Sequence, residues 1–190
     1  NNLVLLDIEY NELSGTLPSS LKNLSNLKTL RFPGNQLSGE IPDWLGSLTN
    51  ISTLSLSSNN FSGSIPAELG SMTNLKKLHL QVNRLTGPIP SELGSLTNLE
   101  LVNLESNQLS GVIPTELGNM VNLKYLFLFN NRLTGNIPIT LGNLPDLTGI
   151  DLSSNQLTGS IPMELGSLEN LEWLLLDGNQ LDGSILSELG

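Results

Sequence analysis

The chain has 190 residues and is 38% apolar, with 18 glycines, 10 prolines and only 4% aromatic residues, a composition typical of many short elements joined by frequent turns. Its net charge of −10 argues against a phosphate backbone or an anionic membrane as partner, so we expect no nucleic acid binding. The lack of cysteine excludes disulfides and Cys-based metal sites. No apolar run is long enough to span a bilayer, so we expect no membrane insertion within this segment.

The sequence repeats with a period of 24 residues, and the shared pattern is LxxLxLxxNxLxGxIPxxLGxLxN. Such a period indicates a solenoid, in which each repeat buries its apolar face against its neighbours. We expect a single domain, 1–190, with seven complete repeats (3–170) and a partial eighth (171–190). Because the chain starts and stops inside the pattern without polar caps, we expect it to be a fragment of a longer protein. The repeats begin at Leu3, Leu27, Ile51, Leu75, Leu99, Leu123, Leu147 and Leu171.

The first half of each repeat predicts a short, half-buried strand followed by a turn. Leucines such as Leu54 and Leu56 alternate with outward residues, which is the period of a strand. The asparagine that follows is expected to satisfy backbone N–H and C=O groups of neighbouring coils, so that successive asparagines form a ladder. It recurs at Asn11, Asn35, Asn59, Asn83, Asn107, Asn131, Asn155 and Asn179.

The second half of each repeat predicts a glycine turn and a short helical segment. Gly63 and its equivalents are expected to need a positive φ or a close backbone approach. Pro66 fits the first turn of a 3₁₀ or α segment, and Gly70 is expected to end that segment. The glycines of the first kind are Gly15, Gly39, Gly63, Gly87, Gly111, Gly135, Gly159 and Gly183.

The block L-[ST]-G-x-[IL]-P-x-x-L-G occurs as LTGPIPSELG at 85–94, LSGVIPTELG at 109–118 and LTGSIPMELG at 157–166. It resembles the plant-specific class of leucine-rich repeats, and the resemblance covers essentially the whole chain. This implies an α/β-type repeat solenoid: a right-handed superhelix with a concave parallel β-sheet, a second short strand around the SGxIP segment and short 3₁₀ or α segments on the convex side.

The same resemblance implies an extracellular protein, either secreted or the ectodomain of a membrane protein. The class is found in receptor-like kinases, receptor-like proteins and polygalacturonase-inhibiting proteins, which bind peptides, proteins or glycans. The paired-cysteine caps, transmembrane helix and kinase of such proteins are absent from this sequence, which leaves open a free-standing repeat protein.

Three N-x-[ST] sequons in the first three repeats predict glycosylation on secretion, at Asn23, Asn50 and Asn60. A chain this rich in asparagine, serine and threonine also produces sequons by chance.

Because folding explains the framework positions, a binding site is expected among the outward strand residues, which stack into three columns on the concave face. The middle column reads Asp7, Arg31, Ser55, His79, Asn103, Phe127, Asp151 and Leu175. The column before it reads Leu5, Thr29, Thr53, Lys77, Leu101, Tyr125, Gly149 and Trp173. The column after it reads Glu9, Pro33, Ser57, Gln81, Glu105, Phe129, Ser153 and Asp177.

These columns contain an apolar patch that no inward packing requires. The sixth repeat presents three aromatic side chains together, Leu101 lies beside them, and Trp173 lies two repeats further on. Between them Gly149 is expected to leave a gap into which a ligand side chain inserts. Exposed apolar patches and aromatic anchors are typical of interaction sites.

Acidic residues border the patch and favour a partner with a Lys or Arg beside an apolar anchor. The predicted ligand-binding residues are Leu101, Glu105, Tyr125, Phe127, Phe129, Asp151, Trp173, Leu175 and Asp177. Self-association, or burial under a neighbouring segment, would also account for such a patch.

Repeats two to four carry a modest basic zone, formed by Lys28, Arg31, Lys76, Lys77 and His79. Their pattern favours a solvated surface over a dedicated site. His79 is the only histidine and has no second His or Cys near it in the repeat, so neither a metal site nor a cofactor is expected.

The function expected is non-catalytic recognition of a protein or peptide ligand, such as a co-receptor or a cell-wall enzyme. An open sheet offers no deep pocket to tune a catalytic carboxylate or nucleophile, so no catalytic residue is assigned. One alternative is a secreted inhibitor of a cell-wall-degrading enzyme, and another is an ice-binding repeat protein. The second is suggested by a hydroxyl column before the glycines, Ser14, Ser38, Ser62, Thr86, Ser110, Thr134 and Thr158, which also belongs to the family pattern.

Overall fold

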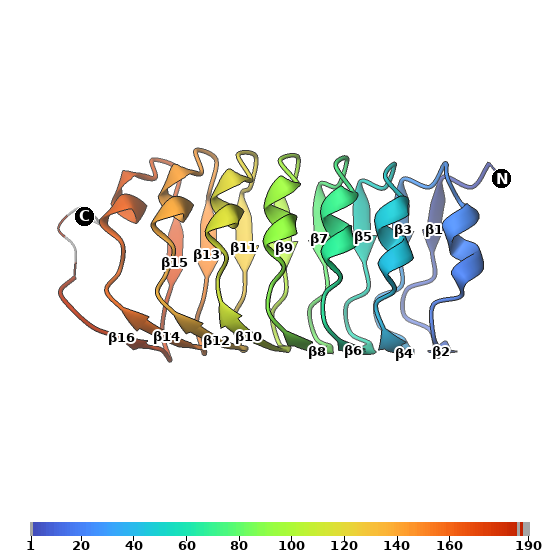
Figure 1. Cartoon of the computed structure of the whole chain (residues 1–190), viewed down its shortest axis with the longest axis horizontal. Coiled ribbons are helices and arrows are strands. Elements are labelled where there is room, and N and C mark those ends of the chain that lie inside the picture. The colour runs from blue at the N-terminus through green and yellow to red at the C-terminus, as the bar shows by residue number, and fades with distance from the viewer. Residues whose placement is uncertain (1, 186, 188–190) are drawn as a thin grey trace.

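A computed structural model describes residues 2–185 and 187. The chain winds as a row of coils, with its two termini at opposite ends of the row (Figure 1). Each coil contributes one strand to a parallel sheet of eight strands, in sequence order. Leu6 pairs with Leu30, and Leu30 with Leu54, so the register advances by one 24-residue repeat at every strand. The strands are β1 (Leu5–Asp7), β3 (Thr29–Arg31), β5 (Thr53–Ser55), β7 (Lys77–His79), β9 (Leu101–Asn103), β11 (Tyr125–Phe127), β13 (Gly149–Asp151) and β15 (Trp173–Leu175).

A second set of short strands lies along the lower edge of the coils in Figure 1 and confirms the strand expected around the SGxIP segment. It is also parallel and has eight strands. These are β2 (Ser14–Gly15), β4 (Gln36–Glu40), β6 (Asn60–Gly63), β8 (Arg84–Gly87), β10 (Gln108–Val112), β12 (Arg132–Gly135), β14 (Gln156–Gly159) and β16 (Gln180–Leu181).

Short 3₁₀ helices complete the first seven coils and confirm the expected helical layer. Each begins directly after the repeat's proline, whose fixed φ and missing N–H suit a helix start. They are η1 (Ser19–Asn23), η2 (Asp43–Ser47), η3 (Ala67–Ser71), η4 (Ser91–Ser95), η5 (Thr115–Asn119), η6 (Ile139–Asn143) and η7 (Met163–Ser167). No helix in the described residues is long and apolar enough to cross a membrane.

The glycine within each 3₁₀ helix has a role different from the one predicted. Gly70 lies inside η3, which ends one residue later at Ser71 and is capped by Met72. A Cβ built on Gly70 would lie 2.5 Å from the carbonyl oxygen of Glu92 in the next coil. Glycine is therefore needed here because adjacent coils approach closely, and not because it stops the helix.

The core is a continuous column of inward leucines and isoleucines. Leu54, Leu78 and Leu126, which stack from strand to strand, are completely buried. Since each coil covers the apolar face of the next, the core has no boundary between repeats.

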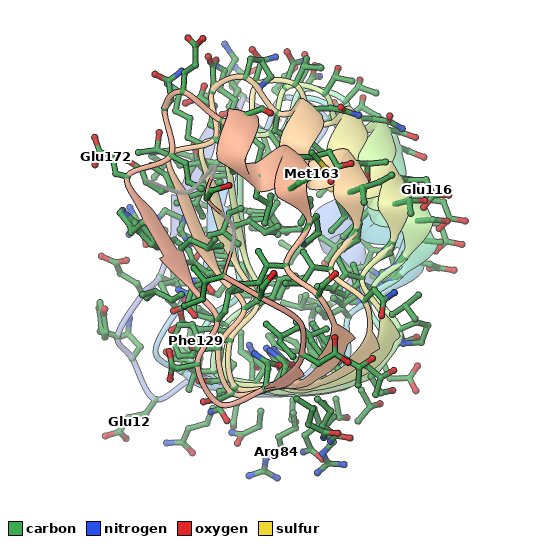
Figure 2. All side chains as sticks on the ribbon, turned by 90° about the vertical axis from the view of Figure 1, so that its left-hand side faces the viewer. Glu12, Arg84, Glu116, Phe129, Met163 and Glu172 are labelled. Carbon is green, nitrogen blue, oxygen red and sulfur yellow. The ribbon has the colours of Figure 1, made fainter. Side chains whose placement is uncertain are left out.

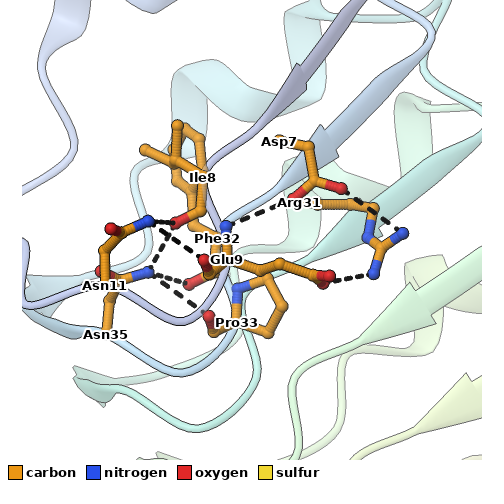
Figure 3. Close-up of polar contacts among 8 residues, drawn as sticks. All are labelled: Asp7, Ile8, Glu9, Asn11, Arg31, Phe32, Pro33 and Asn35. Carbon is orange, nitrogen blue, oxygen red and sulfur yellow. Dashed lines mark hydrogen bonds and ion pairs between the residues drawn. The ribbon is translucent and has the colours of Figure 1, made fainter.

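The predicted asparagine ladder is confirmed. The Asn107 side chain donates to the carbonyls of Leu80, Leu104 and Glu105 at 3.1 Å, and its Oδ1 accepts the N–H of Leu85 at 3.0 Å. It therefore ties its own turn to the preceding coil. Figure 3 shows the start of the ladder, where Asn35 binds the carbonyl of Ile8.

The turn before each ladder asparagine adopts a left-handed conformation that the repeat pattern does not reveal. The predicted glycines of the next turn do have positive φ, at 74° for Gly63. At the position directly before the ladder asparagine, only Gly34 and Gly178 are glycines, and Val82 at this position has a φ of 55°. A β-branched residue is strained there, because its side chain crowds the backbone at positive φ. The remaining non-glycine residues at this position are Tyr10, Ser58, Ser106, Asn130 and Ser154.

Candidate functional site

The aromatic side chains of the first sheet form one stacked platform. The Tyr125 and Phe127 rings, both from β11, lie 6.1 Å apart with an angle of 6° between their planes. The Trp173 ring, from β15, lies 6.0 Å from Tyr125 and 5.5 Å from Phe127. Separations in this range are favourable for aromatic pairs, and all three side chains remain half-buried. The platform is therefore pre-formed and still accessible.

The indole of Trp173 occupies the space above Gly149, where the sequence predicted an open gap. A Cβ on Gly149 would lie 2.3 Å from Cζ2 of Trp173, so the ring rests directly on the backbone of β13. This contact lets Trp173 reach across one strand to β11. The prediction of an insertion gap is therefore wrong: glycine makes room for the protein's own tryptophan.

The other predicted apolar residues lie around the platform. Leu101 is half-buried on β9, next to Tyr125 in the register. Phe129 follows β11, is half-buried, and lies on the same side of the coil as the sheet (Figure 2). Leu175 is 44% exposed at the end of β15. The stack thus extends into a broader apolar surface.

The three predicted acidic residues differ in accessibility. Asp151 is only 8% exposed, and its Oδ1 accepts the N–H of Ser153 at 3.0 Å and its hydroxyl at 2.6 Å. Asp177 is exposed, and Glu105 is half-buried with Asn103 donating to its carboxylate at 3.2 Å. Burial raises the pKa of Glu105, and the nearby Asp151 carboxylate acts in the same direction against the Asn103 hydrogen bond. Glu105 and Asp177 are the acids able to meet a ligand cation.

A hollow of about 550 Å³ lies on the same sheet face, in the first to fourth repeats. Its lining includes Thr53, Ser55 and Ser57 from the third repeat, whose short side chains leave space between longer neighbours. Ser55 and Ser57 are 6% exposed, so they form the floor. The hollow was not predicted. The sequence does contain a signal for it, because all three outward residues of the third repeat are small.

The cations around this hollow are not equivalent. Arg31 is paired with Glu9 and with Asp7, the latter at 3.5 Å (Figure 3), which leaves it largely neutralised. Lys77 forms no ion pair with any described residue. Burial lowers the pKa of His79, helped by the charges of Lys77 and Arg31, so His79 is neutral near pH 7. Lys77 therefore carries the available positive charge.

Gln81 also lines the hollow and has a buried Oε1 atom without a hydrogen-bond partner. An unsatisfied acceptor of this kind is costly in an isolated protein. A ligand N–H or O–H donor entering the hollow would satisfy it.

Of the remaining predicted basic residues, Lys76 pairs with Glu100 at 3.2 Å, and Lys28 does not line the hollow. Only part of the predicted basic zone is therefore brought together. Among the described residues there is no group of three or more His, Cys, Asp or Glu side chains placed to hold a metal ion.

The sequon asparagines differ in exposure. Asn23, at the end of η1, and Asn50, before β5, are exposed, whereas Asn60 is half-buried as the first residue of β6. The Asn50 side chain donates to the carbonyl of Ser25 at 2.8 Å.

These features define a repeat solenoid of parallel coils with a pre-formed aromatic platform and a polar hollow on one sheet. The leucine-rich-repeat family profile matches residues 1–61, 73–133 and 137–181. The chain belongs to the leucine-rich-repeat family and is of the plant type. No curated protein sequence matches it.

Solved structures of plant receptors are similar over nearly the whole chain. The plant peptide hormone receptor RGFR1, solved in complex with RGF2, is 41% identical with a TM-score of 0.97, over 98% of this chain and 30% of that one. The ectodomain of the Arabidopsis receptor kinase HAESA, in complex with the peptide hormone IDA, is 37% identical with a TM-score of 0.94, over 99% and 32%. A further structure of HAESA contains both IDA and the co-receptor SERK1. The chain thus spans about a third of these receptors.

A plant ice-binding protein is also similar. It is 30% identical with a TM-score of 0.70, over 96% of this chain and 66% of that one. Its similarity is lower than that of the two receptors in both measures.

Proposed function

We propose that this protein is a non-catalytic recognition domain that binds a protein or peptide ligand through the face of the β1-to-β15 sheet. The observation that carries the proposal is the half-buried stack of Tyr125, Phe127 and Trp173, which no requirement of the coil explains. Stacked aromatic side chains that are already in place bind an apolar group with little loss of conformational freedom.

The arrangement around the platform supports a ligand with a mixed anchor. An apolar side chain would pack on the rings, and a Lys or Arg beside it would meet the carboxylates of Glu105 and Asp177. An extended chain continuing along the sheet would reach the hollow. There Lys77 would favour an acidic or carbonyl group, and Gln81 would accept a hydrogen bond from the ligand.

The similar receptors support this assignment. RGFR1 and HAESA are described with peptide hormones bound, and HAESA also with a co-receptor. By analogy with such ectodomains, we infer an extracellular location and a peptide or co-receptor as partner. An inhibitor of a cell-wall-degrading enzyme would use the same face, and a larger, folded partner would distinguish it from a receptor segment.

Ice binding is the second candidate, supported by the similar ice-binding protein and by the hydroxyl column in the second sheet. The register weakens it. Ser38 pairs with Asn60 rather than with Ser62, so the hydroxyls of these adjacent strands are offset along the sheet. Thermal hysteresis at high protein concentration tests this candidate directly.

The proposed face can be tested with random linear peptides displayed on phage. Peptides that bind the chain are selected, and their affinities for the chain and its variants are measured. Replacing Phe127 and Trp173 with alanine together is expected to weaken binding at least about ten-fold, close to 1.4 kcal/mol. The matched control replaces Val121 and Ile139, which are exposed at 48% and 59% but lie outside the three outward columns, with alanine. Circular dichroism checks that both variants remain folded. Equal affinities of the two variants would overturn the assignment of this face.

A further inference from the structure

A groove of about 1150 Å³ crosses the second to fifth repeats on a different side of the molecule from the aromatic platform. It runs between the second sheet and the 3₁₀ helices, along the Ile-Pro pairs of four consecutive repeats. In Figure 2, Glu116 from this groove and Phe129 from the sheet face lie on opposite sides of the coil. The groove is therefore separate from the proposed ligand-binding face.

The floor of the groove is apolar and built from buried isoleucines and prolines. Ile41, Ile65, Ile89 and Ile113 are 2% or 3% exposed, and each precedes a proline that also lines the groove. At its edge, Val112 is 59% exposed. Proline rings and an uncovered valine give a surface on which apolar side chains can pack without rearrangement.

The rim of the groove is acidic and has no cationic counterpart. Its carboxylates belong to Glu40, Asp43, Glu68, Glu92 and Glu116, all exposed, and no Lys or Arg lines the groove. The three ion pairs found among the described residues all lie elsewhere. Glu92 and Glu116 accept only long hydroxyl hydrogen bonds from Ser91 and Thr115, at 3.4 and 3.3 Å.

The coil itself does not require this charge. Glu68, Glu92 and Glu116 occupy equivalent positions of successive repeats. At that position three other repeats carry Ser20, Trp44 and Thr140, and the seventh carries Glu164, which does not line the groove. Like charges on adjacent coils, whose strand backbones lie roughly 5 Å apart, repel one another and favour a positively charged occupant.

We propose that this groove binds a basic, extended segment of a partner protein, in which Lys or Arg alternates with apolar residues. Four repeats span roughly 15 Å, the length of four or five extended residues. In an extended segment alternate side chains point to opposite sides, so apolar residues would face the Ile-Pro floor. The long stems of Lys or Arg would reach the carboxylates of the rim.

A synthetic octapeptide of alternating arginine and valine, blocked at both ends and fluorescently labelled, is the probe. Fluorescence anisotropy with the full chain is expected to show saturable, salt-sensitive binding. Replacing Glu68, Glu92 and Glu116 with glutamine together is expected to weaken it at least about ten-fold, because each exposed pair is weak singly but the set acts together. Val112→Arg, which places a cation at the groove edge, is expected to weaken it as well.

The matched control makes the same change of charge outside the groove. Asp146→Asn, Glu169→Gln and Glu172→Gln remove three exposed carboxylates that do not line it, and together they are expected to change affinity less than about two-fold. Equal losses in the two triple variants would mean that the peptide follows net charge alone, and would overturn the proposal. Equal binding of an arginine–serine octapeptide would overturn it too, since the floor would then contribute nothing.

Two further experiments distinguish peptide binding in the groove from self-association and from binding on the sheet. If sedimentation shows a dimer of the chain that Val112→Arg abolishes, the groove is a self-association surface and the proposal fails. The variant lacking Phe127 and Trp173 is expected to bind the basic octapeptide normally, since the platform lies on another face. Loss of binding in that variant would place the peptide on the sheet and refute the groove.

Discussion

The indole of Trp173 lies on the backbone of Gly149, at a distance that excludes even a methyl group there. A Cβ on Gly149 would come within 2.5 Å of Cε2 and Cη2 of the ring as well as 2.3 Å from Cζ2. Because the backbone at position 149 is not in the left-handed region, glycine is needed there to make room for the indole ring and not to allow the chain conformation. The two residues together hold the platform in place.

Gly149→Ala is therefore expected to displace the indole and cost about 1–3 kcal/mol of stability, as overpacking typically does. The near-ultraviolet circular dichroism of the stacked rings should weaken in parallel. In a double-mutant cycle, Gly149→Ala should cost much less when Trp173 is already alanine. An unchanged penalty in that background would show that the contact does not couple the two residues.

Loss of one ladder asparagine is expected to destabilise the whole solenoid. Asn107→Ala removes an amide that serves three carbonyls and one N–H, and leaving buried groups unpaired costs about 1–3 kcal/mol each. Asn11→Ala is the control, because that exposed side chain binds only the nearby carbonyls of Ile8 and Glu9. Urea denaturation should give a clearly lower midpoint for Asn107→Ala alone, and similar midpoints would contradict the ladder's contribution.

Val82→Asn is expected to raise stability by about 1 kcal/mol, because asparagine tolerates the left-handed backbone that strains a β-branched residue. Val82 has a φ of 55° and is 47% exposed, so little packing is lost. Val121→Asn is the matched control, since Val121 is 48% exposed and has no positive φ. The melting temperature should rise only for Val82→Asn. A rise of equal size in the control would point to surface polarity as the cause.

Stability is expected to fall as the pH decreases through 6.5, the ordinary pKa of histidine, owing to His79. Burial and the charges of Lys77 and Arg31 lower the pKa of His79 in the folded state. Between the two values the unfolded chain binds more protons, which favours unfolding. Above this window the group makes no pH-dependent contribution. Urea titrations at several pH values measure the free energy of unfolding, and in His79→Gln its fall below pH 6.5 should disappear. If the fall persists in this variant, other groups cause it.

Glycans are expected at Asn23 and Asn50 more fully than at Asn60 when the chain is secreted from a eukaryotic cell. The first two are exposed, whereas Asn60 is half-buried at the start of β6. Mass spectrometry before and after enzymatic deglycosylation, with single Asn→Gln variants, measures the occupancy. Higher occupancy at Asn60 would mean that the sugar is attached before this strand forms.

The sequence determined the coil. Its 24-residue period specified the strand, the asparagine ladder around residues such as Asn107, the left-handed glycines such as Gly63, and the proline that starts each 3₁₀ helix. These features are predictable because a repeat contacts only its neighbours, so the same local interactions recur at a fixed spacing. The outward columns likewise indicated which residues share one face.

The tertiary structure decided how side chains from different coils meet. It placed Trp173 over Gly149 against β11, buried Asp151 beside Ser153, and opened a hollow above Ser55. It also showed that position 70 requires glycine because the carbonyl oxygen of Glu92 in the next coil lies too close for a side chain. The outward columns read from the sequence give the order of residues along the sheet. They do not give the direction in which a long side chain leans, because that depends on the space left by the residue one coil away.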